Sequence, residues 1–546
     1  MSHTIITICA IPLDLMAPMI CWRRELHAKE MILKFFDNFE SKDKMVEHKG
    51  KVSALGTKCS HYGAPLEKGT LCNGRVRCPW HGACFNVETG DIEDFPGLDS
   101  IPSYEVHIND GEVRIKGSRA LLTANKRTRN MVKRDPENNT TFVVVGGGGC
   151  GASAVETLRS EGFTGRLLMI TNENYIPYDR PKLSKVMDFS AEKLALRSEK
   201  FYKEFDIEIL LGTSLDGINT EKKELYLSTG EKESYDKVLI ATGGSPRKLG
   251  CSGEELQGVF YVRSPEDSNA INNAATEKNV VVVGTSFIGM ETAGFLADKA
   301  TSVTVIGMTN APFERSLGSA IGARIQSFFE EKGVKFINNA AVSEILGNDG
   351  NVSEVKINNG DVLQADVVVV GVGVLPCTNF LKGTNVGITQ RGFVPVNEYM
   401  ETNIPDVYCG GDIASFPLFL QENNLVNIGH WQVHLGENYS LLANVLEELC
   451  VNSISAVAWS AMFKKSLNTN GFGTFDDVII SGDLENLSFI AYYCSGSRVV
   501  AVASLMKDPA AANYAEMLLQ ERWLTKDQVL EDPITPKYSM SLKLSC

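Results

Sequence analysis

The pattern of apolar and polar positions divides the chain into three parts that predict different architectures. Between residues 31 and 117 the apolar runs are short and separated by frequent glycines, which predicts a small all-β domain. From residue 140 short apolar strands alternate with helical segments, which predicts doubly wound α/β domains. Residues 445–546 combine both patterns and predict an α+β domain, with strands over 478–480, 488–493 and 499–502 and a helix over 510–522.

The apolar strand predicted over 142–145 leads directly into a glycine-rich turn and a helical segment over 152–158. The motif G-x-G-x-x-G is formed by Gly146, Gly148 and Gly151. In this strand–turn–helix setting such glycines allow a tight turn and a close approach of the backbone to a pyrophosphate. The next apolar strand, 167–170, is followed by Glu173, about where an acid binds ribose hydroxyls. We therefore predict a dinucleotide site here.

A second apolar strand, 280–283, enters a similar turn. Its predicted nucleotide-binding residues are Gly284, Gly289 and Glu291. Ser286 replaces the middle glycine, so a purely structural strand–turn–helix remains the alternative. After the following strand, 303–306, Gly307 and Met308 occupy the position where an acid favours NADH or an arginine favours NADPH. The sequence therefore does not choose between the two nucleotides.

Two cysteine–histidine pairs stand close together within the glycine-rich N-terminal part. The candidate metal ligands are Cys59, His61, Cys78 and His81. Two thiolates on one iron and two imidazoles on the other make up a Rieske [2Fe-2S] centre. A Cys2His2 zinc site has the same ligand types, and uncoordinated core cysteines are a further alternative. Zinc fingers usually place their two histidines together on a helix, whereas here each histidine follows a cysteine, which favours the cluster.

Composition and charge narrow the classes of partner. The chain has 546 residues and a net charge of −14, which disfavours nucleic acid as a partner because phosphate binding needs clustered positive charge. Its thirteen cysteines are scattered, which indicates a reducing, intracellular compartment, with cytoplasm and mitochondrion both left open. The apolar stretch 4–22 is interrupted by Pro12, Asp14 and Pro18 and gives no firm membrane segment.

Further motifs make most of the chain resemble FAD-dependent pyridine-nucleotide oxidoreductases. They occupy residues 178–185, 241–247, 371–373 and 410–412. Within that group the chain is similar to ferredoxin reductases of oxygenase systems and to apoptosis-inducing-factor-like proteins with an N-terminal Rieske domain. Residues 78–85 resemble the second ligand loop of Rieske ferredoxins. Ala83 stands where respiratory Rieske proteins have a serine that donates to the cluster, which predicts a lower potential.

The resemblance also implies the cofactors and their contacts, which are FAD, NAD(P)H and a [2Fe-2S] cluster. Arg180, Lys185 and Arg247 are expected to contact FAD. Asp412 is expected at its ribityl or phosphate portion and Trp431 near the isoalloxazine ring. NAD(P)H is expected over 284–291 and 371–373, which includes Gly373. Residues 172–200 contain no cysteine, so the redox-active cysteine pair of disulfide reductases is absent and no catalytic side chain is certain.

The resemblance implies a multidomain fold, with an all-β Rieske domain, two doubly wound α/β dinucleotide-binding domains and an α+β C-terminal reductase domain. Residues 1–30 show no period-two pattern, which predicts a divergent segment or a missing first strand. The basic residues of 118–139 are expected to form a solvated linker, with docking of the Rieske domain as the alternative. The expected division is a divergent N-terminal segment 1–30, Rieske domain 31–117, basic linker 118–139, FAD domain 140–263 and 386–444, NAD(P)H domain 264–385 and C-terminal domain 445–546.

Together these features predict an FAD-dependent NAD(P)H oxidoreductase that passes electrons from NAD(P)H through FAD to the Rieske cluster. The final electron acceptor is unidentified and could be another protein, as in an oxygenase system. An NADH-sensing apoptosis or redox signalling protein with incidental turnover is the alternative.

Overall fold

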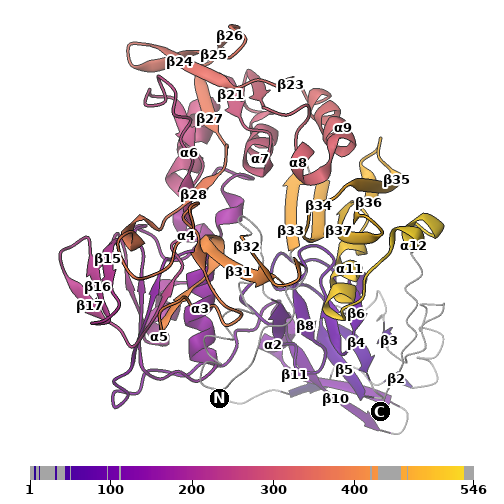
Figure 1. Cartoon of the computed structure of the whole chain (residues 1–546). Helices are drawn as coiled ribbons and strands as arrows, with labels where there is room; N and C mark the ends of the chain where they lie inside the picture. The colour runs from indigo at the N-terminus through magenta and orange to yellow at the C-terminus, as the bar shows by residue number, and fades with distance from the viewer. Residues whose placement is uncertain are drawn as a thin grey trace.

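A computed structural model describes most of the chain (Figure 1). The described residues are 5–7, 11–12, 31–33, 43–48, 51–94, 96–109, 112–418, 421–427, 457–463 and 465–533. Trp431, expected near the flavin ring, lies outside them. Within the described part, every helix is too short or too polar to span a bilayer.

The N-terminal domain is built from two antiparallel sheets and a short 3-10 helix. Its elements are β1 (Ile5–Thr7), β2 (Ile11–Pro12), β3 (Met31–Leu33), β4 (Asp43–His48), β5 (Lys51–Gly56), η2 (Leu66–Lys68), β6 (Thr70–Cys72), β7 (Arg75–Arg77), β8 (Cys84–Asn86), β9 (Ile92–Asp94), β10 (Ser103–Asn109) and β11 (Glu112–Ser118). One sheet has the order β1-β11-β10-β5-β4-β3 with β2 also beside β11, and the other has the order β6-β7-β8-β9. Buried Leu55, Val76 and Phe85 form part of the core of this domain.

The N-terminal segment contributes strands that its sequence pattern does not reveal. β1 pairs antiparallel with β11, with Ile5 opposite Ser118 and Thr7 opposite Lys116. β2 pairs with the same strand through Ile11 and Val113. Runs of two or three residues are too short to show a period of two, so only the pairing with a strand far along the chain identifies them.

Residues 118–139 connect the N-terminal domain to the first α/β unit and make ion pairs with both. They begin with the short helix α2 (Arg119–Thr123), and the backbone of Arg127 pairs with that of Ser100. Arg127 forms an ion pair with Asp91 of the N-terminal domain. The same segment reaches the following domain through the pairs Arg129–Glu161 and Arg134–Glu208. Carboxylates on both neighbouring domains therefore pair with basic residues of this segment, while its described residues stay at least partly exposed.

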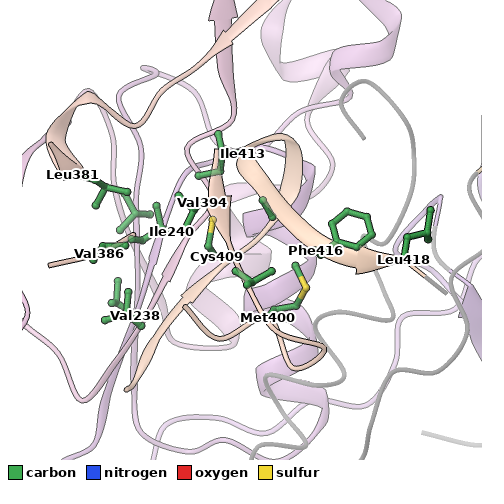
Figure 2. Packing of buried hydrophobic residues seen from close by; sticks show 14 of the residues in the cluster. Val238, Ile240, Leu381, Val386, Val394, Met400, Cys409, Ile413, Phe416 and Leu418 are labelled. Atoms are coloured by element: carbon green, nitrogen blue, oxygen red, sulfur yellow. The ribbon is translucent and has the colours of Figure 1, made fainter. Parts of the chain in front are cut away.

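The first α/β unit is a parallel sheet of the order β14-β13-β12-β18-β30. Its bounds are β12 (Thr141–Val145), α3 (Gly149–Ser160), β13 (Arg166–Ile170), β14 (Ile207–Leu210), β18 (Lys237–Ile240) and β30 (Val407–Cys409). β30 returns to this sheet after the second α/β unit has been completed, so the second unit is inserted into the first. Figure 2 shows apolar side chains from the early and the late part of this unit, among them Val238, Ile240 and Cys409, meeting in one core.

The second α/β unit repeats the plan with a parallel sheet of the order β20-β27-β21-β22-β23. Its elements are β20 (Val259–Tyr261), α6 (Pro265–Ala275), β21 (Asn279–Val283), α7 (Phe287–Leu296), β22 (Ser302–Ile306), α8 (Glu314–Leu317), α9 (Ser319–Glu330), β23 (Val334–Ile337) and β27 (Val367–Val370). The central strands β21 and β27 are almost continuous valine runs because both faces of a parallel sheet are covered. This unit occupies the top of Figure 1.

Short strands and helices, paired mostly antiparallel where they form ribbons, make up the rest of this part of the chain. They are η3 (Arg180–Lys182), α4 (Ala191–Leu194), α5 (Glu199–Glu204), β15 (Leu215–Asn219), β16 (Glu224–Leu227), β17 (Lys232–Ser234), β19 (Gly244–Pro246), β24 (Val342–Asn348), β25 (Asn351–Ile357), β26 (Val362–Gln364), β28 (Val374–Pro376), η4 (Asn379–Leu381), β29 (Val394–Pro395), η5 (Gly411–Ile413), β31 (Ala414–Leu418) and β32 (Asn424–Val426). The segment around η3 contributes directly to the site described below.

The C-terminal unit is an antiparallel sheet of the order β33-β34-β37-β36-β35 with two helices. Its elements are β33 (Val457–Met462), β34 (Lys465–Gly471), β35 (Asp477–Asp483), β36 (Ser488–Ser495), β37 (Arg498–Leu505), α11 (Ala510–Leu519) and α12 (Lys526–Glu531). The predicted strands lie within β35, β36 and β37, and the helix predicted over 510–522 ends at Leu519.

Helix α11 also holds the N-terminal domain in place. In Figure 1 the yellow helix lies beside the indigo strand β6. The Arg77 guanidinium donates to the Glu516 carboxylate at 2.6 Å, and both side chains are buried. The Thr70 hydroxyl donates to the Asn513 side chain at 2.5 Å. Because α11 is covered by its own sheet and by the N-terminal domain, most of its residues are buried, as expected for a helix packed on several sides.

Candidate functional site

Two loops of the N-terminal domain present the predicted metal ligands with the same backbone geometry. In the loop between β5 and η2, the Cys59 N–H donates to the Ala64 carbonyl at 2.8 Å. In the loop between β7 and β8, the Cys78 N–H donates to the Ala83 carbonyl at 2.7 Å. Each cysteine therefore closes a turn to the residue five positions later, although the two sequences differ.

A glycine completes each ligand loop and brings the histidines together. Gly63 has φ 77° and Gly82 has φ 76°, a left-handed conformation that other residues rarely adopt. The turns direct His61 and His81 toward each other, with their Nδ1 atoms 3.2 Å apart. Burial lowers the pKa of His61 to about 4 and that of His81 well below its ordinary value. Both imidazoles are therefore neutral near pH 7, which is the form that binds iron.

The two cysteine sulfurs also form a pair. A hydrogen bond between Cys59 and Cys78 raises the pKa of the Cys59 thiol and lowers that of Cys78. Backbone N–H groups of both loops, including those of His61 and His81, favour the thiolate form of the adjacent cysteine. Such donors stabilise sulfur ligands of iron–sulfur clusters.

The donor types of these four side chains fit a [2Fe-2S] cluster. Within the described residues, no group of three or more His, Cys, Asp or Glu side chains is arranged to hold one metal ion. A Cys2His2 zinc site needs four converging ligands. A thiol pair and a separate imidazole pair instead supply two ligands to each iron of a [2Fe-2S] cluster.

The first glycine-rich turn leaves an empty cradle at the start of α3. A side chain at Gly146 would overlap the Ala241 carbonyl, and one at Gly151 would overlap the Gly146 carbonyl. These two glycines therefore serve close packing. No atom lies within 4 Å of the position that a Cβ of Gly148 would take. The space beside Gly148 at the N-terminus of a helix suits a pyrophosphate.

The second glycine-rich turn has the same construction. Gly284 has φ 117°, and a side chain there would overlap the Gly371 carbonyl. A side chain at Gly289 would overlap the Gly284 carbonyl. Ser286, which replaces the middle glycine of the motif, is the N-cap residue of α7 and faces a cavity. The substitution therefore keeps the strand–turn–helix geometry.

A cavity of about 500 Å³ joins the N-terminal domain to both α/β units. Seven of the predicted site residues contribute to its wall, namely His61, Gly148, Arg180, Lys185, Glu291, Gly373 and Asp412. Four further predicted residues lie outside the wall and allow close backbone packing within the two turns, namely Gly146, Gly151, Gly284 and Gly289. The cavity therefore brings a ligand of the predicted cluster next to both predicted nucleotide sites.

Arg180, which lines the cavity, is oriented by an ion pair and by an aromatic ring. Arg180 forms a two-pronged ion pair with Glu173, with N–O distances of 2.8 and 3.0 Å. Its guanidinium also lies 4.7 Å from the centre of the Tyr178 ring. Glu173, predicted to bind a ribose, therefore also orients the predicted flavin ligand Arg180.

Glu291 connects the second glycine-rich turn to the η3 segment. Its carboxylate accepts from Lys185 Nζ at 2.9 Å and from the Ser460 hydroxyl at 2.6 Å. Ser184 also donates to it. Sequence analysis missed Ser460, because it comes from β33 and no local motif marks it.

Arg247 does not line the cavity shared by the other predicted flavin ligands. It borders a separate opening of about 840 Å³ together with Lys248 and Arg263. Its backbone N–H donates to the Gly373 carbonyl at 2.9 Å, so it supports the turn that carries Gly373. Pro246, the last residue of β19, and Arg263 line both openings, so Arg247 lies next to the cavity without bordering it.

Comparison with known proteins agrees with this geometry. Residues 140–436 match the model of the pyridine nucleotide-disulphide oxidoreductases, and residues 19–105 match that of the Rieske [2Fe-2S] domain. The chain belongs to the pyridine nucleotide-disulphide oxidoreductases. This oxidoreductase is 44% identical to Apoptosis-inducing factor 3 of Homo sapiens, over 89% of its own length and 81% of that protein.

Bacterial reductases are also similar to this oxidoreductase. Rhodocoxin reductase of Rhodococcus erythropolis is 28% identical over 73% of this chain and 94% of its own length. A crystal structure of putidaredoxin reductase in covalent complex with putidaredoxin superposes with a TM-score of 0.68 and 25% identity, over 73% of this chain and 98% of that one. The protein is therefore a ferredoxin reductase-like NAD(P)H oxidoreductase with a Rieske domain, and its cofactors are FAD and a [2Fe-2S] cluster.

Proposed function

We propose that this oxidoreductase passes electrons internally, from NAD(P)H through FAD to the Rieske cluster, and then to an external one-electron acceptor. The observation that carries the proposal is the cavity wall, where His61, Gly148 and Gly371 come from the three candidate cofactor sites. When bound, FAD accepts a hydride from the nicotinamide and the cluster accepts single electrons. One NAD(P)H therefore yields NAD(P)+, a proton and two successive one-electron transfers.

The proposed ligands follow from the residues in the cavity wall. The N–H groups at the start of α3 and the space beside Gly148 would bind the FAD pyrophosphate, with Arg180 and Asp412 as further contacts. The turn that carries Gly371 and Gly373 would receive the nicotinamide. Because nicotinamide and flavin supply the chemistry, these residues would act by positioning.

The domain assignment is part of this proposal. The first α/β unit, interrupted by the second, would be the FAD domain of 140–263 and 386–444. The inserted unit, 264–385, would bind NAD(P)H. The parallel sheet that β30 rejoins after the insertion supports this division. Cys59, His61, Cys78 and His81 would hold the cluster.

We also propose a redox protein as the external acceptor. Among the relatives are rubredoxin-NAD+ reductase of Pseudomonas putida and ferredoxin-NAD(P)+ reductase of a Sphingomonas species. The signalling alternative draws on the similarity to Apoptosis-inducing factor 3. It predicts slow turnover, a long-lived reduced flavin and an assembly state that depends on NADH.

Electron paramagnetic resonance on the anaerobic holoprotein tests the proposal. We expect a Rieske-type signal after reduction with NADH and the same signal after reduction with dithionite. A signal with dithionite alone would retain the cluster but contradict the internal path, in favour of the signalling alternative. The absence of a signal with both reductants, in protein that contains iron, would contradict the cluster assignment.

A further inference from the structure

Tyr62 packs against a predicted cluster ligand in the wall of the cavity. Its ring stacks on the His61 imidazole, with centres 3.9 Å apart and an angle of 19° between the planes. It meets the second imidazole, His81, edge-on at 5.4 Å. Tyr62 and His61 both line the cavity that also contains Gly148. The phenol ring therefore covers the histidine edge of the cluster site on the side of the predicted flavin.

The hydroxyl of Tyr62 reaches across the domain boundary. It donates to Oδ2 of Asp179 at 2.6 Å, although the two residues are 117 positions apart. Asp179 immediately precedes η3, the helix that begins with the predicted flavin ligand Arg180. The contact thus connects the loop that carries His61 to the segment that carries Arg180.

Asp179 is itself held in place by a neighbouring cation. Lys182 Nζ lies 2.9 Å from Oδ2 of Asp179 and 5.3 Å from the centre of the Tyr62 ring. The Asp179 side chain is 13% exposed, so water screens these interactions little. A hydrogen bond from a phenol to a partly buried carboxylate that already has a cation partner has a well-defined geometry.

His61 is also confined on a second side. A Cβ on Gly97 would lie 3.3 Å from the Cβ of His61, so the loop around Gly97 packs closely on this ligand. The same loop is tied to the reductase part by Asp99, whose carboxylate is 2.8 Å from Arg197. The position of His61 relative to the cavity is therefore set by contacts from both domains.

We infer that Tyr62 and Asp179 are positioning residues for the internal electron transfer, because their hydrogen bond fixes the histidine edge of the cluster against the flavin cavity. The inference rests on the proposed function. In the transfer concerned, one electron of the hydride taken from NADH reduces the oxidised cluster. The second follows after the cluster has been reoxidised by the external acceptor. Tyr62 and Asp179 are neither oxidised nor reduced in this sequence.

The test compares two rates in the anaerobic holoprotein after mixing with NADH. Flavin reduction is followed by its absorbance and cluster reduction by freeze-quench electron paramagnetic resonance. In Tyr62→Phe, which keeps the stacked ring, and in Asp179→Asn, we expect cluster reduction to be about tenfold slower, as for the loss of a hydrogen bond to a charged group. Flavin reduction should be unchanged. The double variant should be no slower than either single variant, because both lose the same bond.

A matched control is Tyr175→Phe, which removes a tyrosine hydroxyl bonded to Glu266 close to the same segment but away from the cluster loops. It should leave both rates unchanged. The dithionite-reduced signal and the midpoint potential of the cluster should be the same in the unaltered protein, Tyr62→Phe and Tyr175→Phe, which carry the same charges, whereas Asp179→Asn removes a negative charge that acts on His61. A normal rate of cluster reduction in Tyr62→Phe would overturn the inference, and so would a slower rate accompanied by a changed potential. If NADH fails to reduce the cluster of the unaltered protein, the proposed function fails and the inference fails with it.

Discussion

At the scale of single residues, burial and shared charge decide how Glu156 behaves. Its carboxylate on α3 pairs with Arg197 at 2.9 Å, and the same guanidinium pairs with Asp99 at 2.8 Å. One cation thus serves two buried carboxylates from different domains, while Arg129 provides a weaker favourable charge. Burial raises the pKa of Glu156 to about 7 in spite of the favourable pair with Arg197.

The raised pKa predicts a specific dependence of stability on pH. Between its ordinary pKa of 4.5 and about 7, the folded state binds a proton at Glu156 that the unfolded state releases. The stability that this group contributes is present below pH 4.5 and is lost as the pH rises through 7, by roughly 3 kcal/mol at most. Urea denaturation measures the free energy of unfolding of the unaltered protein and of Glu156→Gln. We expect the value of the unaltered protein minus that of Glu156→Gln to decrease as the pH rises over this range. A difference that stays constant or increases with pH would contradict this assignment.

At the scale of elements, two glycines of the same motif at the junction of β12 and α3 have different structural roles. Gly151 permits close packing of the helix on the turn, whereas Gly148 borders open space. Gly148 has φ −80°, which any residue adopts, so its lack of a side chain serves the cavity and not the backbone. A helix N-terminus beside such a space is suited to a phosphate group.

Alanine substitutions should separate the two roles. In Gly148→Ala we expect normal stability of the protein without FAD but an affinity for FAD at least tenfold weaker, about 1.4 kcal/mol, because the methyl group occupies the cradle. In Gly151→Ala we expect a loss of roughly 1–3 kcal/mol in stability, because the methyl group overlaps the Gly146 carbonyl. Flavin fluorescence titration measures the affinity for FAD, and denaturation of the flavin-free protein measures the stability. Equal effects of the two variants on FAD affinity and on stability would refute the division.

At the scale of the whole molecule, the Rieske domain is held by contacts with two segments that lie far apart in the chain. One side of the domain meets α11 through the buried pair of Arg77 and Glu516. Another side meets the reductase part through Tyr62 and Asp179. A domain held at two separate places has a defined position relative to the cavity, which suits electron transfer within one molecule.

The contact with α11 should be the more important of these for stability. Glu516→Ala removes the 2.6 Å partner of the buried Arg77, which keeps Asp94 and the Gly82 carbonyl, and we expect it to cost about 2 kcal/mol in the free energy of unfolding, as for the loss of a buried hydrogen bond between charged groups. The control is Glu93→Ala, which removes a half-exposed carboxylate 3.8 Å from Arg75 and should cost about 0–1 kcal/mol. Chemical denaturation of the Rieske domain, followed by its visible absorbance, measures both variants. A loss in Glu516→Ala as small as that of the control would show that this pair is not required.

The sequence by itself determined the features that depend on neighbouring residues. The cysteine–histidine loops follow from the order of cysteine, histidine and glycine, because turn chemistry is local. The strands and turns around Gly146 and Gly284 follow from apolar runs that end in glycine, because strand, turn and helix are adjacent in the chain. The all-β and α/β character of the domains follows from the same local patterns.

Only the tertiary structure decided which distant residues meet. β1 pairs with a strand more than a hundred residues away, and three residues are too few to carry a pattern. Tyr62 meets Asp179, and Arg77 meets Glu516, through the path of the chain between them. Arg247 belongs to a motif with Ala241, yet it borders a neighbouring opening and Ala241 lines the cavity. Local propensities set the backbone of each loop, whereas the packing of whole domains sets which side chains share a cavity.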